Sequence, residues 1–149
     1  MTILGIDPGY AIVGAGVVDY DGGKFALLEA TAVTTQAGTP FAARLAAIFD
    51  GVAGLIARHK PAAMSIEKLY FNTNTTTAID VAQARGVILL AAAQTGVQVY
   101  EYTPLQVKQS VVGYGRAEKK QVQDMVKLLL RLNAVPKPDD VADALAIAI

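Results

Sequence analysis

Three consecutive runs rich in β-forming residues begin the chain, and they constrain its fold more than any other feature. The runs span residues 3–6, 11–20 and 25–34, and Asp21-Gly22-Gly23 between the last two is typical of a tight turn. This pattern predicts three antiparallel strands, of which the last two form a hairpin.

Helical and strand patterns alternate along the rest of the chain. From residue 40 to residue 56 the large apolar residues recur at helical spacing, which predicts an amphipathic helix with one buried stripe. Strands are predicted at 62–66 and 97–102, and further helices at 75–94, 104–112, 117–132 and 139–149. The order βββ-α-β-α-β-α-α-α predicts an α/β fold: a mixed five-stranded sheet with helices on both faces.

Length and composition limit the classes of protein and of site. A chain of 149 residues that is 53% hydrophobic predicts one domain over residues 1–149 with a full core. The absence of Cys and the single His59 exclude disulfides, thiolate chemistry and Cys- or His-rich metal sites. We interpret His59, at the end of the first helix, as a surface or helix-capping residue.

No segment of the sequence is expected to cross a membrane. The strongly apolar run at 86–93 is much shorter than the roughly 20 residues of a membrane span, and no basic-then-apolar leader begins the chain. We therefore expect a cytoplasmic protein without a membrane partner. The last predicted helix ends on apolar residues 144–149 without a polar cap, so we also expect a longer natural polypeptide.

The charge is balanced overall but not locally. Thirteen basic residues match thirteen acidic ones, yet residues 104–131 hold six bases and two acids. This polarity suits a protein that holds an anion near one edge and cations near another. Helices with solvated Lys and Arg side chains explain the same composition equally well.

Acidic residues stand where apolar strands and the last helix meet their loops. Asp7 and Glu67 each close an apolar strand, while Asp139, Asp140 and Asp143 crowd the start of the last helix. Clustered carboxylates are costly to bury unless a cation is bound, and oxygen ligands without Cys favour Mg²⁺ or Mn²⁺, two of which can act together on a phosphodiester. The alternative is that Asp139 and Asp140 only cap the helix, but capping explains neither Asp7 nor Glu67.

The motif Asp7-x-Gly9-x-x-x-x-Gly14 permits a second interpretation. It is similar to the phosphate-binding hairpin of actin, sugar-kinase and heat-shock ATPases. Those proteins have two lobes and a second phosphate loop, for which 149 residues leave no room. A nucleotide-binding fragment of this kind therefore stays a minor alternative.

Six stretches in order closely resemble one enzyme family. They are Ile3-Leu4-Gly5-Ile6-Asp7-Pro8-Gly9, Ser65-Ile66-Glu67, Ala82-Gln83-Ala84-Arg85-Gly86, Gln106 to Gly113, Ala117-Glu118-Lys119 and Asp140 to Ala148. The chain resembles the bacterial RuvC family of Holliday junction resolvases. The resemblance implies a ribonuclease H-like fold, a homodimer and Mg²⁺-dependent nicking of two opposed strands of a four-way DNA junction, with 5′-phosphate and 3′-hydroxyl ends.

The resemblance also assigns roles to individual residues. Asp7, Glu67, Asp140 and Asp143 match the family's four acidic metal ligands, with two Mg²⁺ per site and Mn²⁺ as a substitute. Lys108 and Lys119 match basic positions that hold phosphates. Arg116 departs from the neutral residue expected of the family and is a further candidate for a phosphate contact. Tyr70, or Phe71 beside it, matches an aromatic position that stacks on an unpaired base at the junction centre.

The protein is expected to have a partner besides DNA, and one alternative function stays open. The resemblance implies a junction branch-migration helicase complex as a partner. A protein that binds junctions without cutting them is the other alternative, and Mg²⁺-dependent nicking would distinguish the two. A role of Arg85 in the dimer or in DNA binding is one alternative, and an ordinary helix-surface arginine is the simpler interpretation.

Overall fold

The sheet has five strands in the order β3-β2-β1-β4-β5. In the computed structural model, which describes residues 1–69 and 75–149, the strands are β1 (Thr2–Asp7), β2 (Ile12–Asp21), β3 (Lys24–Thr34), β4 (Ala63–Glu67) and β5 (Gln98–Tyr102). The first three strands pair antiparallel, while β1–β4 and β4–β5 pair parallel. The predicted mixed five-stranded sheet and its opening hairpin are therefore confirmed.

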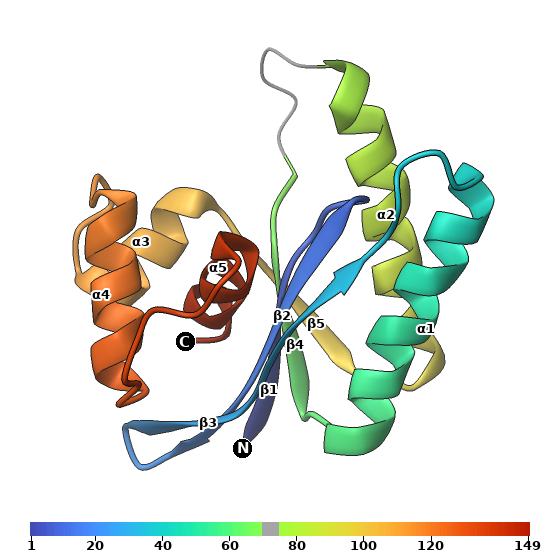
Figure 1. The fold of residues 1–149 in the computed structure, drawn as a ribbon. Helices are drawn as coiled ribbons and strands as arrows, with labels where there is room; N and C mark the ends of the chain where they lie inside the picture. Colours follow the sequence, from blue (N-terminus) through green and yellow to red (C-terminus); the bar gives the residue numbers. More distant parts are fainter. Residues whose placement is uncertain (70–74) are drawn as a thin grey trace.

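Helices cover both faces of this sheet, as predicted (Figure 1). Two of them, α1 (Phe41–His59) and α2 (Thr75–Gln94), lie together on one side. The other side carries α3 (Pro104–Val112), α4 (Lys119–Leu129) and α5 (Asp139–Ala148). This arrangement is the expected ribonuclease H-like fold.

The helix α4 is shorter than the predicted span of 117–132. It begins after a capping box in which the Glu118 side chain accepts from the backbone and the Gln121 side chain accepts from the Glu118 N–H at 2.7 Å. It ends where Arg131 adopts a left-handed conformation with φ 55°. Ala117 is buried just outside the helix, which explains why its apolar character extended the predicted element.

Two hydrophobic clusters fill the spaces on either side of the sheet. Inward-facing residues of β1, β2 and β4 pack against α1 and α2, with Ile48, Val52 and Ile88 fully buried. On the other side, Val126 of α4 and Leu145 of α5 pack over the sheet around Val18. The sheet is thus held rigidly from both faces, which fixes the positions of its strand ends.

The helix α2 bears on the expectation that no segment of the chain crosses a membrane. By length and composition, Thr76–Gln94 is the one helix in the described part of the chain that is apolar enough to span a membrane. Ala84, Ile88 and Ala91 of this helix are buried in the core, and a core helix passes the same test. The finding is therefore weak evidence for a span.

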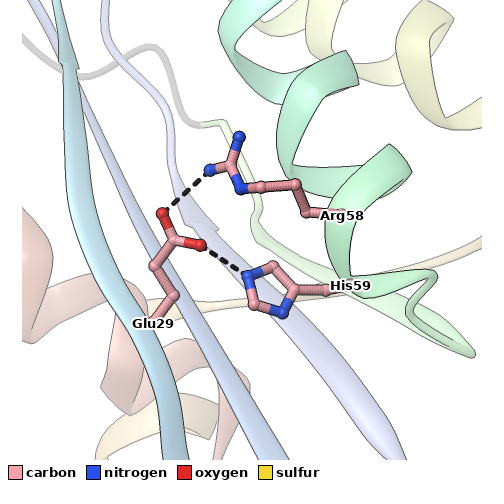
Figure 2. Close-up of polar contacts among 3 residues, drawn as sticks. All are labelled: Glu29, Arg58 and His59. Atoms are coloured by element: carbon pink, nitrogen blue, oxygen red, sulfur yellow. Dashed lines mark hydrogen bonds and ion pairs between the residues drawn. The ribbon is translucent and has the colours of Figure 1, made fainter.

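His59 does not cap α1, so that part of its interpretation is wrong, and its partly exposed side chain is engaged by an acid. His59 and Arg58 both bind the carboxylate of Glu29 on β3 (Figure 2), with Arg58 Nη2 donating to Glu29 Oε1 at 2.8 Å. These hydrogen bonds lower the pKa of Glu29. The helix is instead capped by Lys60, which has a left-handed backbone conformation. Through its bond to Glu29, His59 connects the end of α1 to β3.

Candidate active site

Asp7 and Glu67 lie at the same edge of the sheet. Each is the last residue of its strand, and β1 and β4 are parallel neighbours whose register ends at Ile6 opposite Ile66. The carboxyl ends of parallel neighbours meet at one edge, so the two acids become neighbours although sixty residues separate them. The structure brings these two predicted residues together.

Glycines of β1 and β2 let α5 bring two further acids to this edge. A Cβ on Gly14 would overlap the carbonyl oxygen of Asp140, and a Cβ on Gly5 would overlap that of Ala144. Only a strand surface without side chains at these points lets the helix lie so close. Because Gly14 pairs with Asp7 in the β1–β2 ladder, the first turn of α5 lies beside Asp7.

This packing also explains the motif that had suggested a nucleotide site. Gly14 is needed for the approach of α5, and Gly9 is needed because a Cβ there would overlap the carbonyl oxygen of Ile12. Both glycines of the Asp7-x-Gly9-x-x-x-x-Gly14 motif are therefore accounted for by backbone packing within this fold. The alternative of an actin-like phosphate hairpin loses its support.

Burial and mutual repulsion raise the pKa values of the clustered carboxyl groups. The pKa of Asp7 rises to about 8, first because the group is buried. The nearby carboxylates of Glu67, Asp143 and Asp140 add to this rise, in that order. Burial also raises the pKa values of Glu67 and Asp143. In the absence of a cation, this environment therefore disfavours full ionisation of the cluster.

Asp139 is engaged by two lysines and is not among the acids that raise the pKa of Asp7, although it is adjacent to Asp140. Its Oδ1 accepts from Lys137 Nζ at 3.0 Å, and its Oδ2 lies 3.5 Å from Lys119 Nζ. These partners lower the pKa of Asp139, with Lys137 contributing most. The N-cap of α5 is Pro138, so Asp139 forms ion pairs and is not the helix cap.

Two of the predicted basic residues line a pocket next to the acids. The pocket has a volume of about 230 Å³, and Glu67, Asp143, Lys108 and Lys119 all contribute to its wall. Lys119 Nζ lies 3.5 Å from Asp143 Oδ2, and the charge of Lys108 partly offsets the raised pKa of Glu67. Arg116 is exposed in the turn between α3 and α4. Cations thus stand beside the acidic cluster, at a place where a phosphate could lie.

The side chains of the cluster are of the kind that binds a divalent cation, but in the described residues they do not lie close enough together to coordinate one. Among residues 1–69 and 75–149, no three acidic or histidine side chains form a ready-made coordination group. The donors are nevertheless all carboxylate oxygens. The raised pKa values of Asp7, Glu67 and Asp143 indicate that a positive charge among them would be favourable. A bound cation would have to draw the carboxylates together.

The aromatic candidates Tyr70 and Phe71 lie outside the described residues. Their assignment as a base-stacking wedge therefore stays a prediction from the sequence.

Arg85 of α2 lies against the main chain of Glu67. The Arg85 side chain is only 12% exposed, so its interpretation as a helix-surface arginine is wrong. Its Nε donates to the carbonyl oxygen of Glu67 at 3.3 Å, and its Nη2 lies 3.1 Å from Glu101 Oε1. Its position next to Ala84, within the buried stripe of α2, was the available signal.

Comparison with known proteins agrees with this fold. A family model described as crossover junction endodeoxyribonuclease RuvC matches residues 3–149. Proteins of that name from Brevibacillus brevis and Ruminiclostridium cellulolyticum are 61% and 59% identical over 149 residues, which is all of this chain and 90% of each relative.

Solved structures give the same result. The structure of Thermus thermophilus RuvC in complex with a Holliday junction substrate has a TM-score of 0.95 and 40% identity, over 99% of this chain and 90% of that one. The yeast mitochondrial Holliday junction resolvase Ydc2, at 16% identity over 98% of this chain and 76% of that one, shares the fold with a TM-score of 0.65. With its match over nearly the whole chain, this protein belongs to the RuvC family of crossover junction endodeoxyribonucleases.

Proposed function

We propose that this chain resolves Holliday junctions by nicking two opposed strands of four-way DNA. The observation that carries the proposal is the cluster of Asp7, Glu67 and Asp143 with raised pKa values beside two lysines. Membership of the RuvC family names the substrate class for which such a site is suited. The expected products carry 5′-phosphate and 3′-hydroxyl ends.

Mg²⁺ is the proposed cofactor, with Mn²⁺ as a substitute and two ions per site. Asp7, Glu67, Asp140 and Asp143 would hold them, because these are the oxygen ligands that α5 and the strand ends bring to one edge. Such cations lower the pKa of an attacking water and stabilise charge on the leaving oxygen of a phosphodiester. The carboxylates of this chain supply the negative charge that attracts the cations.

Basic and aromatic side chains would position the DNA. Lys108 and Lys119 share a pocket wall with the acids and are suited to hold phosphates beside the cut. Arg116, exposed nearby on the turn before α4, would add a contact to the backbone of an arm. Tyr70 or Phe71 is proposed to stack on an unpaired base at the junction centre.

A homodimer would give two active sites for two equivalent strands. The helix α2 exposes Ile79 and Leu90, which are 59% and 49% accessible to solvent, on the side away from the core. Apolar residues on an exposed helix face support an interface with a second copy of the chain. A charged residue at Leu90 should produce monomers in sedimentation analysis.

A branch-migration helicase partner, a cytoplasmic location and a single domain stay predictions from the sequence.

Nicking of a labelled four-way junction tests the proposed function. The protein should bind and nick the junction in Mg²⁺, and it should leave a linear duplex of the same sequence intact. In Ca²⁺ it should bind with little cutting, because the larger and looser coordination of Ca²⁺ positions the attacking water poorly. Binding without nicking in Mg²⁺ or Mn²⁺ would favour the non-cleaving alternative.

A further inference from the structure

Arg85 connects α2 to the ends of β4 and β5. Its Nε donates a hydrogen bond to the main-chain carbonyl oxygen of Glu67 at 3.3 Å, and its Nη2 lies 3.1 Å from Oε1 of Glu101. The Arg85 side chain is 12% exposed. A nearly buried positive charge therefore rests against the backbone of a proposed metal ligand.

The contact reaches Glu67 from the face of the sheet opposite to its carboxylate. In the β4–β5 ladder Ile66 pairs with Glu101, and Glu67 pairs with Tyr102. Successive side chains of a strand point to opposite faces. The Glu67 carboxylate therefore faces α5 and Asp143, whereas Glu101 faces α2, where Arg85 meets it.

The peptide unit that follows Glu67 is held at both of its polar groups. Its carbonyl oxygen accepts from Arg85, and its N–H, which belongs to Lys68, donates to the carbonyl oxygen of Tyr102 at 2.8 Å. Fixing both groups fixes the orientation of the peptide plane. Because Glu67 is the last residue of β4, this restraint acts where the regular ladder ends and the main chain would otherwise be free to rotate.

Stability alone is a weak explanation for this arginine. Its Nη2 is buried and forms an ion pair with Glu101 at 3.1 Å, but it makes no hydrogen bond within the described ranges. A buried ion pair with an unused donor stabilises a fold poorly, and apolar residues of similar volume often do as well. The geometry is better explained by a role in orienting the main chain at Glu67.

We propose that Arg85 is a positioning residue for the nuclease reaction. It holds the main chain so that the Glu67 carboxylate faces Asp7 and Asp143 when a divalent cation binds. The inference rests on the proposed role of Glu67 as a metal ligand. Residues that orient metal ligands typically change metal affinity or activity by about 10–100-fold when they are replaced.

The Arg85→Lys substitution separates positioning from stability. A lysine can still pair with Glu101, but it lacks the planar fork through which the arginine reaches Glu101 and the Glu67 carbonyl from two separate nitrogens. Arg58→Lys is the matched control, because Arg58 forms the corresponding pair with Glu29 at the far edge of the sheet. Melting temperature, junction affinity in Ca²⁺, and single-turnover nicking against Mg²⁺ concentration are measured for both variants.

Arg85→Lys should bind the junction with unchanged affinity, nick it about 10–100-fold more slowly and need more Mg²⁺. Without DNA, Mg²⁺ should raise its melting temperature less than it raises that of the wild type. Arg58→Lys should match the wild type in nicking and in Mg²⁺ response. Wild-type nicking and Mg²⁺ dependence in Arg85→Lys, or an equal loss in Arg58→Lys, would overturn the inference.

A second variant covers the case in which Arg85→Lys does not fold. Glu101→Gln removes only the charge that holds the guanidinium. It should also slow nicking, raise the Mg²⁺ requirement and reduce the rise in melting temperature that Mg²⁺ causes. Unchanged Mg²⁺ response and nicking in a folded Glu101→Gln would then overturn the inference. A wild-type protein that does not nick junctions would instead refute the proposed function, whereas the thermal response to Mg²⁺ would still report on Arg85.

Discussion

Gly14 of β2 lies directly against the first turn of α5, where a side chain on Gly14 would overlap the carbonyl oxygen of Asp140. The missing Cβ is what allows α5 to approach Asp7, the ladder partner of Gly14. A residue that carries no functional group thus determines where two proposed metal ligands lie.

Gly14→Ala should therefore damage both stability and nicking. The methyl group would displace α5 from β2, and overpacking of this kind costs about 1–3 kcal/mol. Gly54→Ala in α1 is the control, because its Cβ would meet Arg58 at an ordinary 3.5 Å and Ala stabilises a helix interior by about 0.4–1 kcal/mol. Denaturant unfolding and junction nicking measure the two effects. Full activity in Gly14→Ala would show that α5 tolerates displacement.

The metal-free protein should lose stability as the pH rises. The pKa of Asp7 is raised from 3.8 to about 8, so the folded state holds a proton that the unfolded state releases earlier. That stabilisation is complete below pH 3.8 and is lost as the pH rises toward about 8. Glu67 and Asp143 shift in the same direction.

Asp7→Asn removes the largest part of this dependence. In EDTA, its melting temperature should exceed that of the wild type by more at pH 8.5 than at pH 5, on the order of 2–4 °C for each kcal/mol of repulsion relieved. At pH 8.5, Mg²⁺ should reduce the difference in melting temperature between Asp7→Asn and the wild type, because Mg²⁺ stabilises the wild type. Parallel pH profiles in EDTA would contradict the raised pKa of Asp7.

The sequence predicted those parts of the fold and site that depend on local pattern. Strand and helix periodicities predicted all ten elements in the right order, and acids at the ends of apolar strands identified Asp7 and Glu67. The parallel pairing of β1 with β4 then brings these acids to one edge.

Contacts between distant elements could not be predicted in the same way. The burial of Arg85 depends on where α2 crosses β4 and β5, and the bonds of His59 depend on where α1 ends beside β3. The buried stripe of α2 indicates that Arg85 lies near the core, but no pattern in the chain indicates the partners that either crossing provides. Gly14 also fits a phosphate-binding motif in the sequence, and only the docked position of α5 reveals what its missing side chain accommodates.

Lys119→Ala should weaken junction binding by removing one phosphate contact. The slope of log K against log salt should fall by about one contact, because each neutralised phosphate releases counterions. Lys127→Ala, in the last turn of the same helix, is the control. An unchanged slope in Lys119→Ala would limit Lys119 to its ion pairs with Asp139 and Asp143.

The adjacent acids Asp139 and Asp140 should behave differently. Asp140→Asn should lose Mg²⁺-dependent nicking, because Asp140 is a proposed metal ligand. Its carboxylate is close enough to Asp7 to raise the pKa of Asp7. Asp139→Asn should keep nicking, because its side chain is engaged by Lys137 and Lys119. Nicking assays on two equally folded variants decide the matter. The reverse pattern would place the metal ligands on the other side of the helix.

The most direct test of the central claim compares the wild type with Asp7→Asn on a labelled four-way junction. We expect the wild type to nick two opposed strands in Mg²⁺. Asp7→Asn should bind the junction at least as tightly, because it removes a charge that repels phosphate, and should leave both strands intact. Nicking by purified Asp7→Asn at the wild-type rate would contradict the assignment of the acidic cluster as the active site.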